Sequence, residues 1–116
     1  MSGFQKLLAI LFLTLSASHA AWSADAANGK RVYLADGCFT CHGRAGQGGA
    51  MNYPAPPLAQ TKLPLAVFKI ILRTGPKDMP AYAETVLPDQ DVADIHAFLM
   101  SLPGRRPTLD MPLLNQ

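Results

Sequence analysis

Two cysteines and one histidine stand together in the segment Cys38-Phe39-Thr40-Cys41-His42. The cysteines are three positions apart, and the histidine directly follows the second cysteine. On a turn of helix, positions i, i+3 and i+4 share one face, so both thiols and the imidazole would point the same way. Because the chain contains two cysteines in total, this segment holds every thiol of the protein. It is therefore the first place to look for chemistry that uses two sulfur atoms and an imidazole together.

The Cys-x-x-Cys-His arrangement is typical of covalent haem attachment. Two thiols at this spacing can add to the two vinyl groups of one haem, and the neighbouring imidazole can then reach the iron. The sequence therefore predicts that Cys38 and Cys41 are thioether anchors and that His42 is the proximal iron ligand. The expected cofactor is one covalently bound haem c.

Two other chemistries use the same residue types. A thiol–disulfide oxidoreductase also carries Cys-x-x-Cys, but in a strand–helix context, and Val32-Tyr33-Leu34 ahead of Cys38 belong to a helical stretch. A zinc site could recruit His96 as a fourth ligand. Adjacent Cys41 and His42 are, however, awkward as two ligands of one tetrahedral ion. Both readings remain less favoured alternatives.

The N-terminal segment predicts export. Lys6 supplies a positive charge, residues 7–15 form an uncharged apolar run, and Ser18-His19-Ala20 places small residues where a signal peptidase cleaves. The run is about half of the roughly 20 residues that a membrane-spanning helix needs. We predict a signal peptide over residues 1–20, with cleavage after Ala20 and a periplasmic mature protein. Membrane association is expected only if this segment stays uncleaved.

Composition limits the remaining classes. A chain of 116 residues has room for one domain, and its 49% hydrophobic and 16% charged residues exclude both a disordered tail and a bundle of membrane helices. The net charge of +2, with no basic run interleaved with aromatic residues, argues against nucleic acid as a partner. We expect one domain over residues 25–102 and an extended tail over residues 103–116.

The spacing of apolar residues predicts three short helices. The first runs from the N-cap Asp25 to Ala35, and the second covers residues 65–73. The third begins at Pro88, whose fixed φ suits the first helical position, and ends at Leu102. Acidic residues in its first turn complement the positive end of the helix dipole.

Between the first two helices, residues 43–63 are rich in glycine and proline. Such a segment forms neither a regular helix nor a central strand, and loops of this length are uncommon in a compact domain unless they wrap something. Three short helices alone would make a thin core, which a large apolar prosthetic group would fill. The predicted fold is therefore all-α, with three main short helices and loops wrapped around one covalently attached haem.

With this motif near the start of the mature domain and a methionine well downstream, the chain resembles the class I cytochromes c over about residues 25–102. In that family, a methionine in a loop before the last helix is the second axial ligand. The matching segment, Asp78-Met79-Pro80-Ala81-Tyr82, points to Met79 as the distal ligand. Pro80 biases Met79 away from helical geometry, so the thioether can extend from a loop. Histidine–methionine ligation suits electron transfer.

Other possible ligands have less support. Met51 lies close after the motif, Met100 falls within the last helix, where methionine usually fills a core, and Met111 lies in the tail. His96 is expected to be a partly exposed side chain of the last helix, with iron ligation as the alternative.

The resemblance implies two further contacts. Gly29 would let the first helix cross the last one, with Tyr33 and Phe98 as the aromatic residues on the two partners. A proline carbonyl would accept the proton of the ligating His42. The sequence does not choose among three candidates for this carbonyl: Pro54, Pro56 and Pro57.

We expect an electron carrier and not an enzyme, because small molecules would have to displace the sulfur of Met79 before binding. Redox proteins, such as a dehydrogenase or a terminal oxidase, are the expected partners. The alternative function is a dedicated cytochrome c subunit of a periplasmic dehydrogenase complex. A loose basic cluster either forms a docking surface for an acidic partner or is an ordinary solvated face; it consists of Lys62, Lys69, Arg73 and Lys77.

Overall fold

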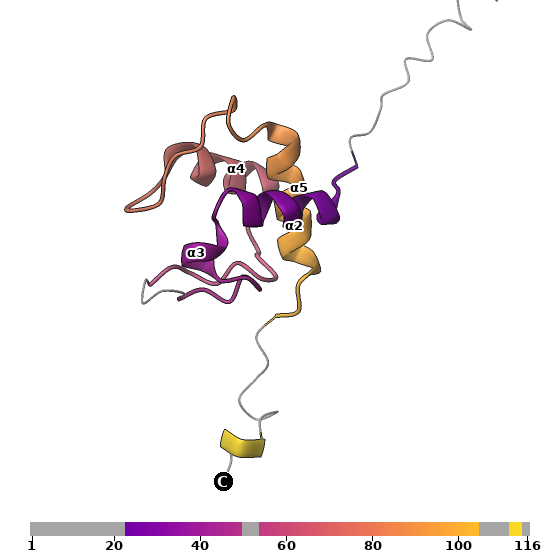
Figure 1. Cartoon of the computed structure of the whole chain (residues 1–116), viewed down its shortest axis with the longest axis vertical. Coiled ribbons are helices and arrows are strands. Elements are labelled where there is room, and N and C mark those ends of the chain that lie inside the picture. Colours follow the sequence, from indigo (N-terminus) through magenta and orange to yellow (C-terminus); the bar gives the residue numbers. More distant parts are fainter. Residues whose placement is uncertain (1–22, 50–53, 105–111, 115–116) are drawn as a thin grey trace, which may run out of the picture.

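The computed structural model describes residues 23–49, 54–104 and 112–114. Within these ranges the chain is helical and contains no strand, which confirms the all-α prediction (Figure 1). Its elements are, in chain order, α2 (Ala26–Ala35), α3 (Phe39–His42), α4 (Leu65–Thr74), α5 (Asp89–Ser101) and the 3₁₀ turn η3 (Pro112–Leu114). The three main helices lie where the sequence predicts them, and α3 is the turn that carries the motif.

Several predictions fall on other parts of the chain. The predicted signal peptide, residues 1–20, lies outside the described residues, as do Met51, Met111 and most of the tail after Gly104. Among the helices that the structure does describe, none is both long enough and apolar enough to cross a membrane.

A crossing of the first and last helices forms the centre of the domain. Gly29 of α2 meets the backbone of α5 so closely that a Cβ atom there would lie 1.9 Å from the carbonyl oxygen of Asp94. One turn further along each helix, the rings of Tyr33 and Phe98 pack with centroids 5.5 Å apart and planes inclined by 59°. The contact implied by the resemblance is present, and glycine is what permits it.

A buried carboxylate reinforces this crossing. Asp94 is 2% exposed and accepts hydrogen bonds from the Asp25 backbone N–H (2.8 Å), the Asn28 amide (2.7 Å) and the Gln90 amide (2.8 Å). Desolvation raises the pKa of this carboxyl, but the three donated hydrogen bonds outweigh it, so the pKa lies below its usual range. The charge is therefore stabilised by donors from the start of α2 and from α5 itself.

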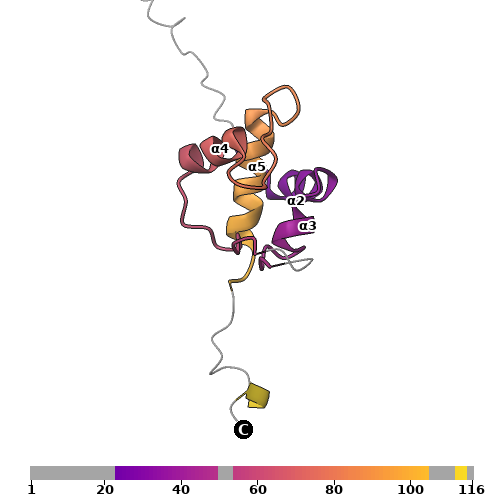
Figure 2. The same cartoon turned by 90° about the vertical axis from the view of Figure 1, so that its left-hand side faces the viewer.

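The third main helix covers the other side of α5. In the view of Figure 2, α5 lies between α2 and α4. Phe68 and Leu72 of α4 are buried against α5, where helical spacing puts them on one face. Together with side chains of α2 and α5 they form one hydrophobic core: Val32, Tyr33, Phe68, Leu72, Leu87, Val92, Ile95, Phe98 and Leu99.

Helix α5 begins one residue later than predicted. Pro88 has a φ of −57°, as a first helical residue would, but its ψ of 155° is extended. It is therefore the N-cap, and Asp89 is the first residue of the helix. The pyrrolidine ring fixes φ alone, so a proline can stand on either side of a helix start.

The C-terminal end of α5 is capped by the glycine- and proline-rich loop over residues 43–63, which we call the wrapping loop. The backbone N–H of Gln60 donates to the carbonyl of Leu99 (3.0 Å), and its side-chain amide donates to the carbonyls of Met100 (2.9 Å) and Leu102. These carbonyls have no partner within the helix, so the contacts satisfy its last turn. One residue thus joins the glycine- and proline-rich loop to α5.

Candidate functional site

The cysteine–histidine segment folds into one helical turn. Cys38 has helical dihedral angles (φ −54°, ψ −37°), and the backbone N–H of His42 donates to its carbonyl at 3.1 Å. Cys38, Cys41 and His42 therefore occupy positions i, i+3 and i+4 and share one face. Both cysteines are free thiols and are partly buried.

Local contacts fix this turn against α2. Gly37, with a φ of +75°, lets the chain leave the end of α2. After the turn, the hydroxyl of the fully buried Tyr33 donates to the carbonyl of Gly43 at 2.8 Å. Burial raises the pKa of Tyr33, and the nearby Cys38 adds to the effect, so the hydroxyl keeps its proton and remains a donor.

The imidazole of His42 is oriented by a proline carbonyl. Its Nδ1 lies 3.0 Å from the carbonyl oxygen of Pro56, so Pro56 is the one of the three candidate prolines that makes this contact. A carbonyl can only accept a hydrogen bond, so Nδ1 carries the proton and Nε2 keeps its lone pair. Ligating histidines typically donate their other ring N–H to a carbonyl in this way.

The surroundings of Cys38 disfavour thiol–disulfide exchange. Burial raises the pKa of its thiol to about 11, the carboxylate of Asp36 adds to the rise, and a backbone hydrogen bond offsets part of it. Reactive cysteines of oxidoreductases have a lowered pKa, because the thiolate is the nucleophile. The strand–helix context of those enzymes is also missing from the described part of the chain.

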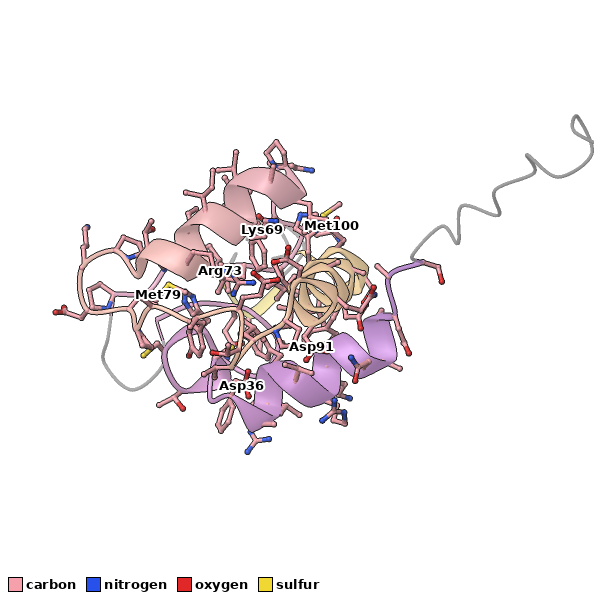
Figure 3. The ribbon with its side chains drawn as sticks, turned by 90° about the horizontal axis from the view of Figure 1, so that it is seen from above. Asp36, Lys69, Arg73, Met79, Asp91 and Met100 are labelled. Atoms are coloured by element: carbon pink, nitrogen blue, oxygen red, sulfur yellow. The ribbon has the colours of Figure 1, made fainter. Side chains whose placement is uncertain are left out.

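Met79 lies on the loop between α4 and α5, beyond the end of α4 (Figure 3). Its backbone N–H donates to the carbonyl of Pro76 at 3.2 Å, within a turn and not a helix. The side chain is partly buried and packs against the hydrophobic core, as does Cys38. The structure thus brings the predicted distal ligand and the motif to the same core.

His96 has a structural role. Its Nε2 lies 2.8 Å from the carbonyl oxygen of Leu63, and its ring packs edge-on against Phe68 with centroids 5.3 Å apart. Its Nε2 is engaged with this carbonyl, which leaves only Nδ1 for a metal. In the ranges that the structure describes, no three His, Cys, Asp or Glu side chains gather as a metal site.

Two of the four members of the basic cluster, Lys69 and Arg73, have an acidic partner within the domain. Lys69 Nζ and Arg73 Nη2 bind the two carboxylate oxygens of Asp89, at 2.9 Å and 2.7 Å. Hydrogen bonds from both cations lower the pKa of Asp89. Their charges are therefore paired with a carboxylate at the start of α5, 20 and 16 positions away in sequence, and all three side chains remain partly exposed. Lys62 and Lys77 are exposed.

The residues around the motif fit a haem. Two thiols on one face, an imidazole with a free Nε2 and a partly buried thioether form the donor set of a histidine–methionine haem c. A porphyrin also needs apolar walls. Partly buried apolar side chains of α3, of the loop over residues 43–63 and of the loop between α4 and α5 pack on the core and would supply them: Phe39, Leu58, Met79 and Tyr82.

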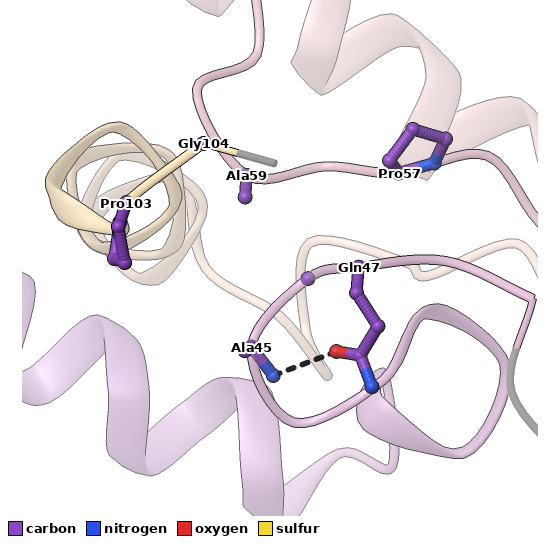
Figure 4. A pocket seen from close by; sticks show the side chains of 7 residues that line it. Ala45, Gln47, Pro57, Ala59, Pro103 and Gly104 are labelled. Atoms are coloured by element: carbon purple, nitrogen blue, oxygen red, sulfur yellow. Dashed lines mark hydrogen bonds between the residues drawn. The ribbon is translucent and has the colours of Figure 1, made fainter. Parts of the chain in front are cut away.

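A separate open hollow of about 420 Å³ lies beside the end of α5 (Figure 4). The wrapping loop and Pro103-Gly104 line it, and the Gln47 side chain there accepts a hydrogen bond from the Ala45 backbone N–H at 3.0 Å. Neither the motif nor Met79 contributes to its lining. It is therefore distinct from the site built by the motif.

Comparison with known proteins agrees with the geometry. Residues 24–99, more than half of the chain and including both the motif and Met79, match the family model described as cytochrome C oxidase, cbb3-type, subunit III. Neither a curated protein nor a solved structure gives a significant match. A cytochrome c domain implies covalently bound haem c and haem-based electron transfer. The chain therefore belongs to the cbb3-type cytochrome c oxidase subunit III family and is a c-type cytochrome.

Proposed function

We propose that the chain is a periplasmic electron carrier with one haem c. Thioether bonds from Cys38 and Cys41 hold the haem, His42 is the proximal iron ligand and Met79 the distal one. The observation that carries this proposal is the 3.0 Å contact between His42 Nδ1 and the Pro56 carbonyl, which leaves Nε2 free for the iron on the face shared with both thiols. Thiol–disulfide chemistry would give this contact no role, and adjacent Cys41 and His42 are awkward as two ligands of one tetrahedral zinc ion.

Each group then has a definite task. When bound, the haem supplies one-electron chemistry, its iron alternating between Fe(II) and Fe(III). The Pro56 carbonyl keeps the imidazole of His42 in one tautomer and orientation. The soft thioether of Met79 favours the reduced state and raises the potential. Apolar side chains keep water from the site, so little has to rearrange when one electron arrives or leaves. The protein itself needs to transfer no proton.

The second candidate function is that of a haem subunit in a larger redox complex. The family description names a subunit of an oxidase, which favours a terminal oxidase over the periplasmic dehydrogenase as the complex. A free carrier and a subunit share the same haem site. Purification in mild detergent from the native membrane separates them, since a subunit co-purifies with catalytic chains and a carrier does not.

The first test is to express the full chain with the c-type maturation machinery and record visible spectra. We expect sharp reduced bands, one haem per chain, haem that survives denaturing electrophoresis and the weak far-red ferric band of sulfur ligation. Met79→Ala should abolish only the far-red band. Met100→Ala is the matched control, because Met100 lies on the exposed side of α5. A colourless protein after competent maturation would contradict the proposal.

A further inference from the structure

One cation links the end of α4 to the loop that carries Met79. The guanidinium of Arg73 donates through Nη1 to the backbone carbonyl of Tyr82 at 3.0 Å and through Nη2 to Asp89 Oδ1 at 2.7 Å. Tyr82 lies three residues after Met79. The planar fork of an arginine suits this arrangement, because its donors keep a fixed angle to one another. Asp89 thus holds the guanidinium in place while the other nitrogen binds the loop.

Tyr82 has two further anchors. Its backbone N–H donates to the carbonyl of Leu72 at 2.8 Å, and its hydroxyl donates to the carbonyl of Asp36 at 3.3 Å. The first contact ties the loop to α4, and the second ties it to the residue that follows α2. With Arg73 bound to its carbonyl, Tyr82 is held from three directions and fixes the loop close to Met79.

The backbone of the loop also lies directly against the end of α4. Gly75, with a φ of +57°, terminates the helix, and a Cβ atom there would lie 2.6 Å from the carbonyl oxygen of Met79 and 2.5 Å from the backbone nitrogen of Ala81. The last turn of α4 is therefore the support on which the Met79 segment rests. In the view of Figure 3, Arg73 lies between Lys69 and Met79.

We propose that Arg73, oriented by Asp89, is a positioning residue that keeps Met79 at the haem iron. This inference rests on the proposed histidine–methionine ligation. Replacing Arg73 frees the Tyr82 carbonyl from α4 and lowers the cost of moving the loop away from the iron. An added ligand that competes with the thioether then binds more tightly, because less of its binding free energy is spent on opening the loop.

Imidazole titration of the ferric, fully matured protein measures this cost. We compare wild type with Arg73→Met, which keeps much of the apolar stem, and with Lys69→Met. Lys69 is the matched control, because it donates to the other oxygen of the same carboxylate rather than to the loop. Loss of a hydrogen bond from a charged donor predicts that Arg73→Met binds imidazole about tenfold more tightly than wild type. Lys69→Met should stay within about twofold.

Spectra separate the possible failures. A wild-type protein without the far-red ferric band would overturn the methionine ligation, and this inference with it. A wild-type protein with the band, and with equal imidazole affinity in wild type and Arg73→Met, would overturn the positioning role alone. Equal gains in Arg73→Met and Lys69→Met would do the same, since they would reflect the shared ion pair and not the loop contact.

A further variant keeps the test decisive if Arg73→Met does not retain haem. Arg73→Lys preserves a cation beside Asp89 but lacks the planar fork that serves a carbonyl and a carboxylate at once. We expect an imidazole affinity above that of wild type in this variant. A wild-type affinity in Arg73→Lys would then refute the inference.

Discussion

Replacing Gly29 with alanine tests the crossing that organises the domain. The added Cβ would lie 1.9 Å from the Asp94 carbonyl oxygen and 2.8 Å from the backbone nitrogen of Ile95. Backbone atoms cannot rotate out of the way, so α2 and α5 must move apart. The movement also disturbs the packing of Tyr33 on Phe98 at 5.5 Å and the hydrogen bonds to the buried Asp94 carboxylate.

The magnitude follows from opposing terms. Alanine in place of glycine inside a helix raises the free energy of unfolding by about 1 kcal/mol, because its helix propensity is higher. Overpacking a rigid core costs about 1 to 3 kcal/mol, and loss of an aromatic pair costs about 1 kcal/mol more. We expect Gly29→Ala to lower the free energy of unfolding by about 2 kcal/mol net.

Guanidinium chloride unfolding of the matured protein, followed by far-UV circular dichroism, measures this change. Lys30→Ala is the control, because Lys30 neighbours Gly29 on α2 but is exposed. It should change stability by no more than about 0.5 kcal/mol. A Gly29→Ala protein that is as stable as wild type, or more stable, would show that the gain in helix propensity exceeds the steric cost. The two helices would then not meet as described.

Three further changes test other contacts. Tyr33→Phe removes the buried donor to the Gly43 carbonyl, which still accepts from a backbone N–H at 3.0 Å; we expect a loss of about 1 kcal/mol in chemical unfolding rather than the larger cost of an orphaned carbonyl. Gln60→Ala removes the side-chain donor to the carbonyls of Met100 and Leu102 and should lower stability by about 1 to 2 kcal/mol in the same assay. Gln60→Glu, which keeps an acceptor but loses the amide donor, should not restore it. The pKa of Asp94 is lowered in the folded state, so its charge stabilises the native state above the unfolded pKa of about 4. This contribution is lost as the pH falls through the folded pKa. Between pH 7 and pH 3, the free energy of unfolding should therefore fall less in Asp94→Asn than in wild type.

Much of the fold could be predicted because its signals are local. Asp25 accepts hydrogen bonds from the backbone N–H groups of Ala27 and Asn28, as an N-cap should, and Gly75 ends α4 in a left-handed conformation. The motif and the methionine loop are also contiguous segments. Their positions follow from residue type and spacing, and the family match covers both.

The remaining contacts depend on the folded arrangement of distant segments. Three prolines could have served His42, and the path of the loop selects Pro56. The pairing of Arg73 with Asp89 joins residues 16 positions apart. Residue types alone do not identify this partner, so the sequence groups Arg73 with nearby lysines in a surface cluster. The Pro88 boundary depends on ψ, which a proline ring does not fix.

The helix crossing also determines the order in which the chain can fold. Asn28 and Asp94, which are hydrogen-bonded in the crossing, are 66 positions apart, so almost the whole domain must be present before they meet. During synthesis this contact can therefore form only after both helices have been made. The turn around Cys38, in contrast, is built from neighbours such as Tyr33 and Gly43. A partly made chain already contains every residue of this turn, so both thiols can be presented together before α5 exists.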